Sequence, residues 1–399
     1  DDDGVPYNFP TINDRYKTTN QVFFEESPSN MLIYWANEFA IKHFSNNYTL
    51  GEKIVTREGM ATADNDRFLK YWNEVEIENI GFNVRGNEEI TENTKWFPYN
   101  KGGDFRKWYG NNNYIVDWAN DGYSVKNNID VKTGRVRSHN YNGEYAFKEG
   151  MTWAALTSGK ISVRFSPFGF LFDSKGAMGF SKENIKYYTS LINSKVGMLF
   201  LEFLSPTMDF KVGDIIQIPL VEKNISAIEK TSERNIDISK EEWDSRETSW
   251  DFTKNELIKH KSDTKIETAY FNFCNYWKEH HNTLHQNEEE LNRLFIDIYE
   301  LQDELTADVE LKDITILKNE TKIIDGALVF QADEIMKQFV SYGVGVMLGR
   351  YSLDSDGLLI ANMGQEVPTD TTFEIDDDNV IPVLEDDYFK DDIASRFVQ

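Results

Sequence analysis

The sequence predicts an α+β protein in which a mixed α/β domain is followed by a mainly helical C-terminal domain. Residues 52–220 contain short β-type runs separated by Gly, Asn and Pro turns. Residues 221–399 instead show apolar side chains at helical spacing. With 40% hydrophobic and 14% aromatic residues, the 399-residue chain can bury sizeable cores. We therefore expect three parts, residues 1–51, 52–220 and 221–399.

Residues 1–51 are expected to form a linker and one helix. After an acidic, polar start, apolar residues including Met31, Trp35 and Phe39 predict a helix over about 29–45. No stretch approaches 18 consecutive apolar residues, and the start has neither a basic nor an apolar signal region. We expect a cytoplasmic protein that does not contact a membrane. The single cysteine, Cys274, excludes an intramolecular disulfide.

Residues 52–220 are expected to alternate strands, turns and at least one helix. Ser162–Phe165 and Ile215–Ile218 have the composition of strands, and residues 181–204 have the periodicity of a helix. Residues 59–68, which are small and polar, predict a turn that leads into a helix or strand.

Residues 221–399 are expected to be mainly helical. Asn287 and Glu290 resemble a capping box at the start of a helix over 288–305, and further helices are predicted over 332–348 and from Asp391. The glycines at 343–349 indicate close helix packing rather than a dinucleotide fingerprint. His281 and His285 indicate a solvated helix end rather than a zinc pair.

The charge distribution sets one region apart from the rest of the chain. The net charge of −26 disfavours nucleic-acid binding, because an acidic surface repels phosphates. However, residues 95–200 carry fifteen basic and eight acidic residues, whereas residues 221–399 carry eighteen and forty. We expect one cationic face on a strongly acidic molecule.

The segment 95–113 is the richest candidate for a binding site. It interleaves cations and aromatic rings around a Gly-Gly turn, so that Lys101, Arg106 and Lys107 could neutralise phosphates while rings stack. Asparagine and arginine side chains have the geometry to read adenine and guanine edges. On composition alone, an aromatic turn packed in a core remains an alternative, as does a carbohydrate platform.

A second candidate is the strand-like run at 160–165. Strand alternation would place Lys160, Ser162 and Arg164 on one face, and Lys132, Arg135 and Arg137 add to the basic block. A groove-facing strand and a solvated face are both compatible with this pattern.

The sequence shows none of the motifs that methyl transfer to a base would need. No proline is followed by a second proline, so an acceptor loop of the Asn-Pro-Pro-Tyr type is absent. No glycine-rich turn follows a strand in a way suited to S-adenosylmethionine. We therefore predict no catalytic residues, no metal site and no cofactor in this chain.

Several stretches together resemble the C-terminal half of the BREX phage-defence adenine-specific DNA methyltransferases, the PglX family. They are residues 59–68, 95–111, 160–173, 250–252, 288–305 and 341–353. The related type IIG restriction-modification enzymes share the turn at 59–68. The resemblance implies that a full-length protein transfers a methyl group from S-adenosylmethionine to adenine N6, marking host DNA. Residues 52–220 would be its target-recognition domain, and the helix near 29–45 would lead out of an absent methyltransferase domain. The region after 221 would brace the recognition domain and clamp the duplex.

Our hypothesis is therefore a sequence-specific DNA-recognition module. Its expected partners are double-stranded DNA, the methyltransferase domain of the same protein and other phage-defence proteins. The alternative is a carbohydrate-binding or protein-interaction module, whose affinity would not fall steeply with salt as DNA affinity does. A metal-dependent nuclease would rest on abundant carboxylates alone. The candidate DNA-binding residues are Asn65, Arg67, Lys101, Arg106, Lys107, Trp108, Tyr109, Asn111, Asn112, Arg135, Arg137, Lys160, Ser162 and Arg164.

Overall fold

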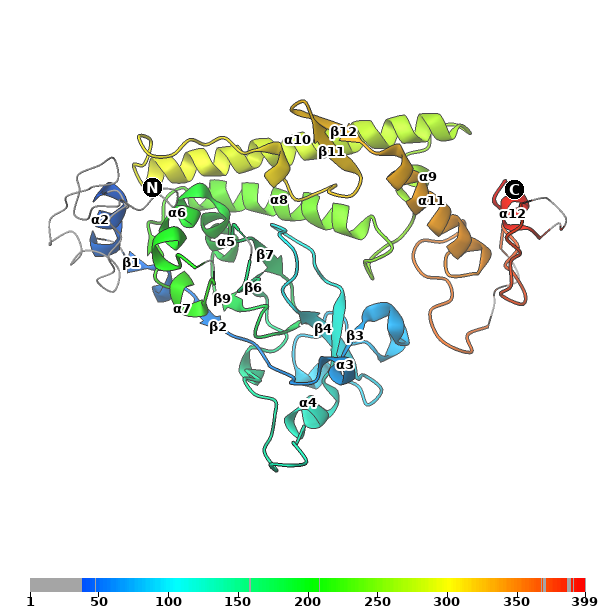
Figure 1. The fold of residues 1–399 in the computed structure, drawn as a ribbon, viewed down its shortest axis with the longest axis horizontal. Helices are drawn as coiled ribbons and strands as arrows, with labels where there is room; N and C mark the ends of the chain where they lie inside the picture. The colour runs from blue at the N-terminus through cyan, green and yellow to red at the C-terminus, as the bar shows by residue number, and fades with distance from the viewer. Residues whose placement is uncertain are drawn as a thin grey trace, which may run out of the picture.

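Two four-stranded sheets organise the first part of the chain, and long helices organise the second. The structure is a computed structural model that describes residues 38–46, 48–157, 159–207, 209–366, 368, 371–385, 389 and 391–398. Figure 1 shows helices α8 and α10 running along one side of the molecule, with the sheets packed beneath them. The predicted α+β class is confirmed.

The first sheet is antiparallel throughout. Its order is β2 (Val55–Arg57), β9 (Met178–Phe180), β6 (Gly150–Trp153) and β7 (Val163–Ser166). All but one residue of β6 and β7 are buried, because the two faces of this sheet are covered by other elements. The strand predicted at 162–165 is thereby confirmed.

The second sheet takes three of its four strands from the basic block of residues 95–200. Its order is β3 (Leu69–Tyr71), β5 (Tyr114–Asp117), β4 (Trp96–Asn100) and β8 (Leu171–Phe172), with β4 and β8 parallel. A separate short pair joins β1 (Tyr48–Thr49) to β10 (Pro219–Leu220), so that residues 48 and 220 lie opposite each other.

Helices connect and cover these sheets. Those before residue 220 are α2 (Glu38–Asn46), α3 (Asn65–Phe68), α4 (Ala119–Lys126), α5 (Ile185–Asn193), α6 (Lys195–Leu204) and α7 (Val212–Ile215). The helix predicted over 181–204 is two helices, because the Ser194 side chain accepts a hydrogen bond from the Gly197 amide and caps the second. The prediction over 29–45 can be compared only from residue 38, since residues 29–37 lie outside the described residues.

The second part of the chain contains α8 (Ile225–Asp244), α9 (Glu256–Lys259), α10 (Ile266–Ile298), α11 (Ala332–Met347) and α12 (Ile393–Val398), with the hairpin β11 (Thr321–Ile324) and β12 (Ala327–Phe330) before α11. The helices predicted over 332–348 and from Asp391 are confirmed. Gly343 and Gly345 pack closely as expected, since an added Cβ would lie 2.4 Å from the Phe397 ring and 2.6 Å from the Tyr351 ring, respectively.

Three local predictions were wrong. Ile215–Ile218 is not a strand: Ile215 ends the helical turn α7, in which the Asp214 carboxylate accepts from the Lys211 amide, and a turn follows. Asn287 does not cap a helix, because apolar residues upstream continue the same buried face and extend α10 back to Ile266. His281 is not solvated: it is 2% exposed and shares that face with Trp277 and Leu284.

One large hydrophobic core joins the two parts of the chain. It includes Trp153 and Leu191 from the first part together with Trp277 and Phe295 from the second. Helix α8 packs against both α5 and α10. Among the residues that the structure describes, we find no helix long and apolar enough to cross a membrane.

Candidate nucleic-acid interface

The turn at residues 59–68 exposes two of the predicted DNA-binding residues, and hydrogen bonds and close packing hold its backbone. Asp64 caps α3 by accepting from the Arg67 amide at 3.3 Å, and the Thr62 hydroxyl donates to the side-chain oxygen Oδ1 of Asn65 at 2.7 Å. Gly59 is required by close packing, since an added Cβ would lie 2.1 Å from the Phe172 carbonyl oxygen. Asn65 and Arg67 are exposed on this turn.

A hairpin at residues 128–137 lies beside that turn. Ala61 bridges His139, and the Asn128 side chain donates to the Thr62 carbonyl oxygen at 3.0 Å. Both Arg135 and Arg137 are exposed. The structure therefore brings four predicted residues, Asn65, Arg67, Arg135 and Arg137, to neighbouring loops. In Figure 1 these loops occupy the end of the molecule around α3 and α4, away from α10.

Two further cations flank an aromatic ring on the adjoining surface. The Arg57 guanidinium lies 4.8 Å from the centre of the Tyr145 ring, and the Lys148 ammonium lies 5.2 Å from it. Our sequence reasoning missed both. Lys148 belongs to the basic block and could have been included, but Arg57 reaches this surface only through strand β2, 88 residues away from Tyr145.

We call Arg57, Arg67, Lys132, Arg135, Arg137 and Lys148 the cationic surface. Arg57 is half-buried and the other five are exposed. Within the part of the chain that the structure describes, none of the six forms an ion pair with a carboxylate. Acidic residues, including Glu58, Asp66 and Asp130, lie among them in the sequence. The surface thus offers unpaired positive charge to an external anion.

The richest predicted segment proves to be buried. Trp108 is 1% exposed, Tyr109 4%, Asn112 6%, Arg106 7% and Lys107 9%. A phosphate or a sugar ring cannot reach these side chains in this conformation. The prediction that they form a binding surface is corrected: on composition alone the packed aromatic turn was the other alternative, and it is the one observed.

Arg106 is held by partners from distant helices. Its guanidinium donates to the Glu242 carboxylate at 2.6 Å and to the carbonyl oxygens of Tyr109, Ser239 and Thr315. Burial works to raise the pKa of Glu242, but Arg246 and Arg106 outweigh it and hold that pKa below its usual value. The carboxylate is therefore ionised and fully paired at neutral pH.

Lys107 and Trp108 share a second buried carboxylate. The Lys107 ammonium lies 2.7 Å from one Glu288 oxygen, and the Trp108 indole donates to the other at 2.8 Å. Arg246 links Glu242 to Glu320, whose carboxylate it contacts at 2.8 Å. We call Arg106, Lys107, Glu242, Arg246, Glu288 and Glu320 the ionic joint, because it connects the segment after β4 to α8, α10 and the β11 region.

The remaining predicted residues are dispersed. Lys160 is exposed but pairs with Asp313 at 2.5 Å, and Lys101 pairs with buried Asp173 at 2.6 Å. The half-buried Asn111 donates to the Asp104 carbonyl oxygen. Ser162 and Arg164 are 2% and 1% exposed, and Ser162 lines a cavity together with Lys160.

Arg164 is unusual among the buried cations. It donates to the Gly102 carbonyl oxygen at 3.1 Å, but its Nε and Nη1 have no protein partner. Burial, assisted by nearby Arg106, lowers the pKa of Arg164 to about 10. The guanidinium remains charged at neutral pH, without a carboxylate to balance it.

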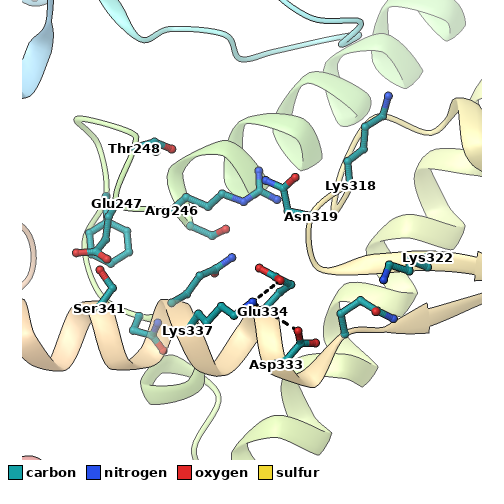
Figure 2. A pocket seen from close by; sticks show the side chains of 15 residues that line it. Arg246, Glu247, Thr248, Lys318, Asn319, Lys322, Asp333, Glu334, Lys337 and Ser341 are labelled. Atoms are coloured by element: carbon teal, nitrogen blue, oxygen red, sulfur yellow. Dashed lines mark hydrogen bonds and ion pairs between the residues drawn. The ribbon is translucent and has the colours of Figure 1, made fainter.

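A polar cavity of about 660 Å³ opens between the end of α8, the β11 hairpin and α11. Figure 2 shows Lys318, Lys322 and Lys337 around it, together with Asp333 and Glu334. Lys337 pairs with Glu334 at 2.6 Å, and Arg246 belongs to the ionic joint. The cavity mixes both signs of charge and contains no convergent catalytic group, so it is a weaker candidate than the cationic surface.

Comparison with known proteins identifies relatives of the whole chain. It is 40% identical to "Adenine-specific methyltransferase PglX" of Lacticaseibacillus casei (strain Zhang), over 97% of this chain and 32% of that protein. It is 32% identical to "Adenine-specific methyltransferase BrxX" of Escherichia coli O9:H4 (strain HS), over 96% of this chain and 31% of that protein. No family model matches the sequence.

The chain thus spans about a third of the length of the curated relatives it matches. Identity of this level over nearly every residue of the chain establishes common ancestry, and the resemblance stated from the motifs is confirmed. The chain is homologous to part of the BREX-type adenine-specific methyltransferases, as fits a C-terminal part of such a protein.

Proposed function

We propose that this chain is the DNA-recognition part of a site-specific adenine-N6 DNA methyltransferase that marks host DNA in bacterial phage defence. Its homologues are adenine-specific methyltransferases, and the chain itself has no acceptor loop of the Asn-Pro-Pro-Tyr type. S-adenosylmethionine and the transfer of its methyl group would belong to the remaining length of a protein like these relatives. Residues 52–220 would supply the surface that contacts the duplex.

The observation that supports this proposal most is the contrast between buried and exposed cations. The ionic joint balances its positive charges internally, whereas none of the six cations of the cationic surface forms an ion pair with a carboxylate of the described residues. Because DNA binding gains free energy by releasing counterions from phosphates, unpaired exposed cations are the groups that contribute. The large negative charge of the C-terminal part would repel the duplex and orient it toward this face.

A charge-reversal experiment tests the proposal. The variant Arg135→Glu with Arg137→Glu is compared with the matched variant Lys261→Glu with Lys278→Glu, which changes the same charge at exposed positions of the second part. Affinity for a pool of random duplex DNA is measured at several salt concentrations. We expect the first variant to lose at least tenfold in affinity and about two units of the salt slope, since each phosphate contact contributes about 0.9.

The outcomes separate the alternatives. If both variants bind like the unchanged chain, or lose affinity equally, the cationic surface does not contact DNA. Salt-insensitive binding to oligosaccharides would support the carbohydrate alternative, although the aromatic rings of residues 96–109 that suggested it are largely buried. Sequencing the DNA that the unchanged chain retains from the random pool would identify the sequence that it prefers.

A further inference from the structure

The hairpin at residues 128–137 has an ordered tip. The Ile129–Val136 bridge and the hydrogen bond from the Arg137 amide to the Asn128 carbonyl oxygen, 2.8 Å long, close its two arms. At the tip, the Asp130 carboxylate accepts from the backbone amides of Lys132 and Thr133 at 3.0 and 2.8 Å. Gly134 supplies the positive φ of 68° that the turn requires. The tip is therefore a preorganised protrusion.

The hairpin also exposes apolar side chains between its cations. Val131 is 98% exposed at the tip, and Ile129 and Val136 are each 51% exposed behind it. Lys132, Arg135 and Arg137 are exposed in the same segment. A single exposed apolar residue needs no explanation, but three on one ten-residue hairpin form a mixed apolar and cationic surface. This combination suits a partner that presents both phosphates and apolar groups.

The major groove of a DNA duplex offers that combination. It is about 12 Å wide and admits a two-stranded ribbon, whereas the minor groove is only about 6 Å wide. It also exposes the C5-methyl group of thymine, which apolar side chains contact and which the minor groove lacks. Arginine side chains on the same ribbon can reach phosphates or guanine edges.

We propose that residues 129–136 enter the major groove of the bound duplex and that Val131 reads a thymine methyl group there. This inference rests on the proposed DNA recognition and adds a groove, an orientation and a specificity residue to it. The methyl group lies opposite an adenine, so the target of an adenine-specific protein always offers one. Lys132 and the two arginines hold the flanking phosphates or base edges.

A double-substitution experiment tests the contact. The duplex preferred by the whole chain is prepared with each thymine replaced in turn by uracil, which removes only the methyl group. Each duplex is bound to the unchanged chain, to Val131→Ser and to the control Val383→Ser, which alters another exposed valine. We expect one uracil position to lower the affinity of the unchanged chain and of the control about fourfold, the value of one buried methyl group.

At that same position, Val131→Ser should lose affinity with thymine and lose nothing further with uracil. If uracil has the same effect on Val131→Ser as on the unchanged chain at every position, the methyl contact is wrong. If, in addition, charge reversal at Arg135 and Arg137 still lowers affinity, DNA recognition stands without it. If neither the thymine-to-uracil change nor the charge reversal lowers the affinity for DNA, the proposed function is rejected as well. Because Val131 is almost fully exposed, unfolding midpoints should be equal for all three proteins.

Discussion

The ionic joint and the cationic surface are built from similar sequence and have opposite roles. Arg106 and Lys107 of the joint and Lys132, Arg135, Arg137 and Lys148 of the surface all come from residues 95–148, where cations, aromatic rings and glycine turns are interleaved. In the joint, Glu242 and Glu288 approach from α8 and α10, neutralise the cations and bury them. No carboxylate pairs with the six cations of the surface in the described residues. The difference teaches that a basic, aromatic motif can serve as a binding surface only where the fold brings no carboxylate to neutralise its cations.

The largest expected effect concerns Arg106. Replacement of Arg106 by Leu should lower the free energy of unfolding by about 3–5 kcal/mol, because Glu242 loses one of its two buried cations. Arg135→Leu should change that free energy by less than about 0.5 kcal/mol, as an exposed residue does. Urea denaturation measures both. Equal losses for the two variants would remove the contrast between joint and surface.

The second-largest loss of unfolding free energy is expected at Glu288. Glu288→Ala leaves the Lys107 ammonium and the Trp108 indole without their shared acceptor, so we expect a loss of about 3 kcal/mol in unfolding free energy. Glu144→Ala, at an exposed carboxylate of the first part, is the matched control. Thermal and urea unfolding should agree, and a loss no greater than that of the control would contradict our assignment of Glu288 to the joint.

A pH titration tests burial elsewhere on α10. Burial, with His285 as a second cause, lowers the pKa of His281 to about 4 from 6.5. Below pH 6.5, His281 is therefore protonated in the unfolded chain but not in the folded chain. The free energy of unfolding falls as the pH decreases from 6.5 to 4. His281→Leu should remove up to about 3 kcal/mol of this fall, measured as the difference between the two pH profiles. Parallel profiles would indicate that His281 is accessible to water.

The smallest effect is expected for a single cation of the surface. Lys132→Ala should leave unfolding unchanged and reduce the salt slope of DNA binding by about 0.9, corresponding to one phosphate contact. Lys107→Met should destabilise the protein without changing the slope of the fraction that stays folded. The reverse pattern, with Lys107 affecting the slope and Lys132 affecting stability, would exchange the roles that we assign to the two regions.

Much of the local structure was predictable because it depends on neighbouring residues. The helix at 332–347 follows from its apolar period, and the strand at 163–166 follows from its β-branched and aromatic composition. Four of the exposed site residues, Asn65, Arg67, Arg135 and Arg137, lie in polar segments rich in turn residues, where exposure is expected. The ends of elements were less predictable: α10 begins more than twenty residues before the expected start.

The sequence by itself determined the fold class, the basic block and the resemblance to adenine-specific methyltransferases, since each depends on composition or on contiguous motifs. Only the tertiary structure decided which cations face solvent. Glu242 lies 136 residues from Arg106 and Glu288 lies 181 residues from Lys107, and no local pattern marks either pair. Arg106 and Lys107 are buried against carboxylates from distant helices, and these ion pairs depend on how those helices pack.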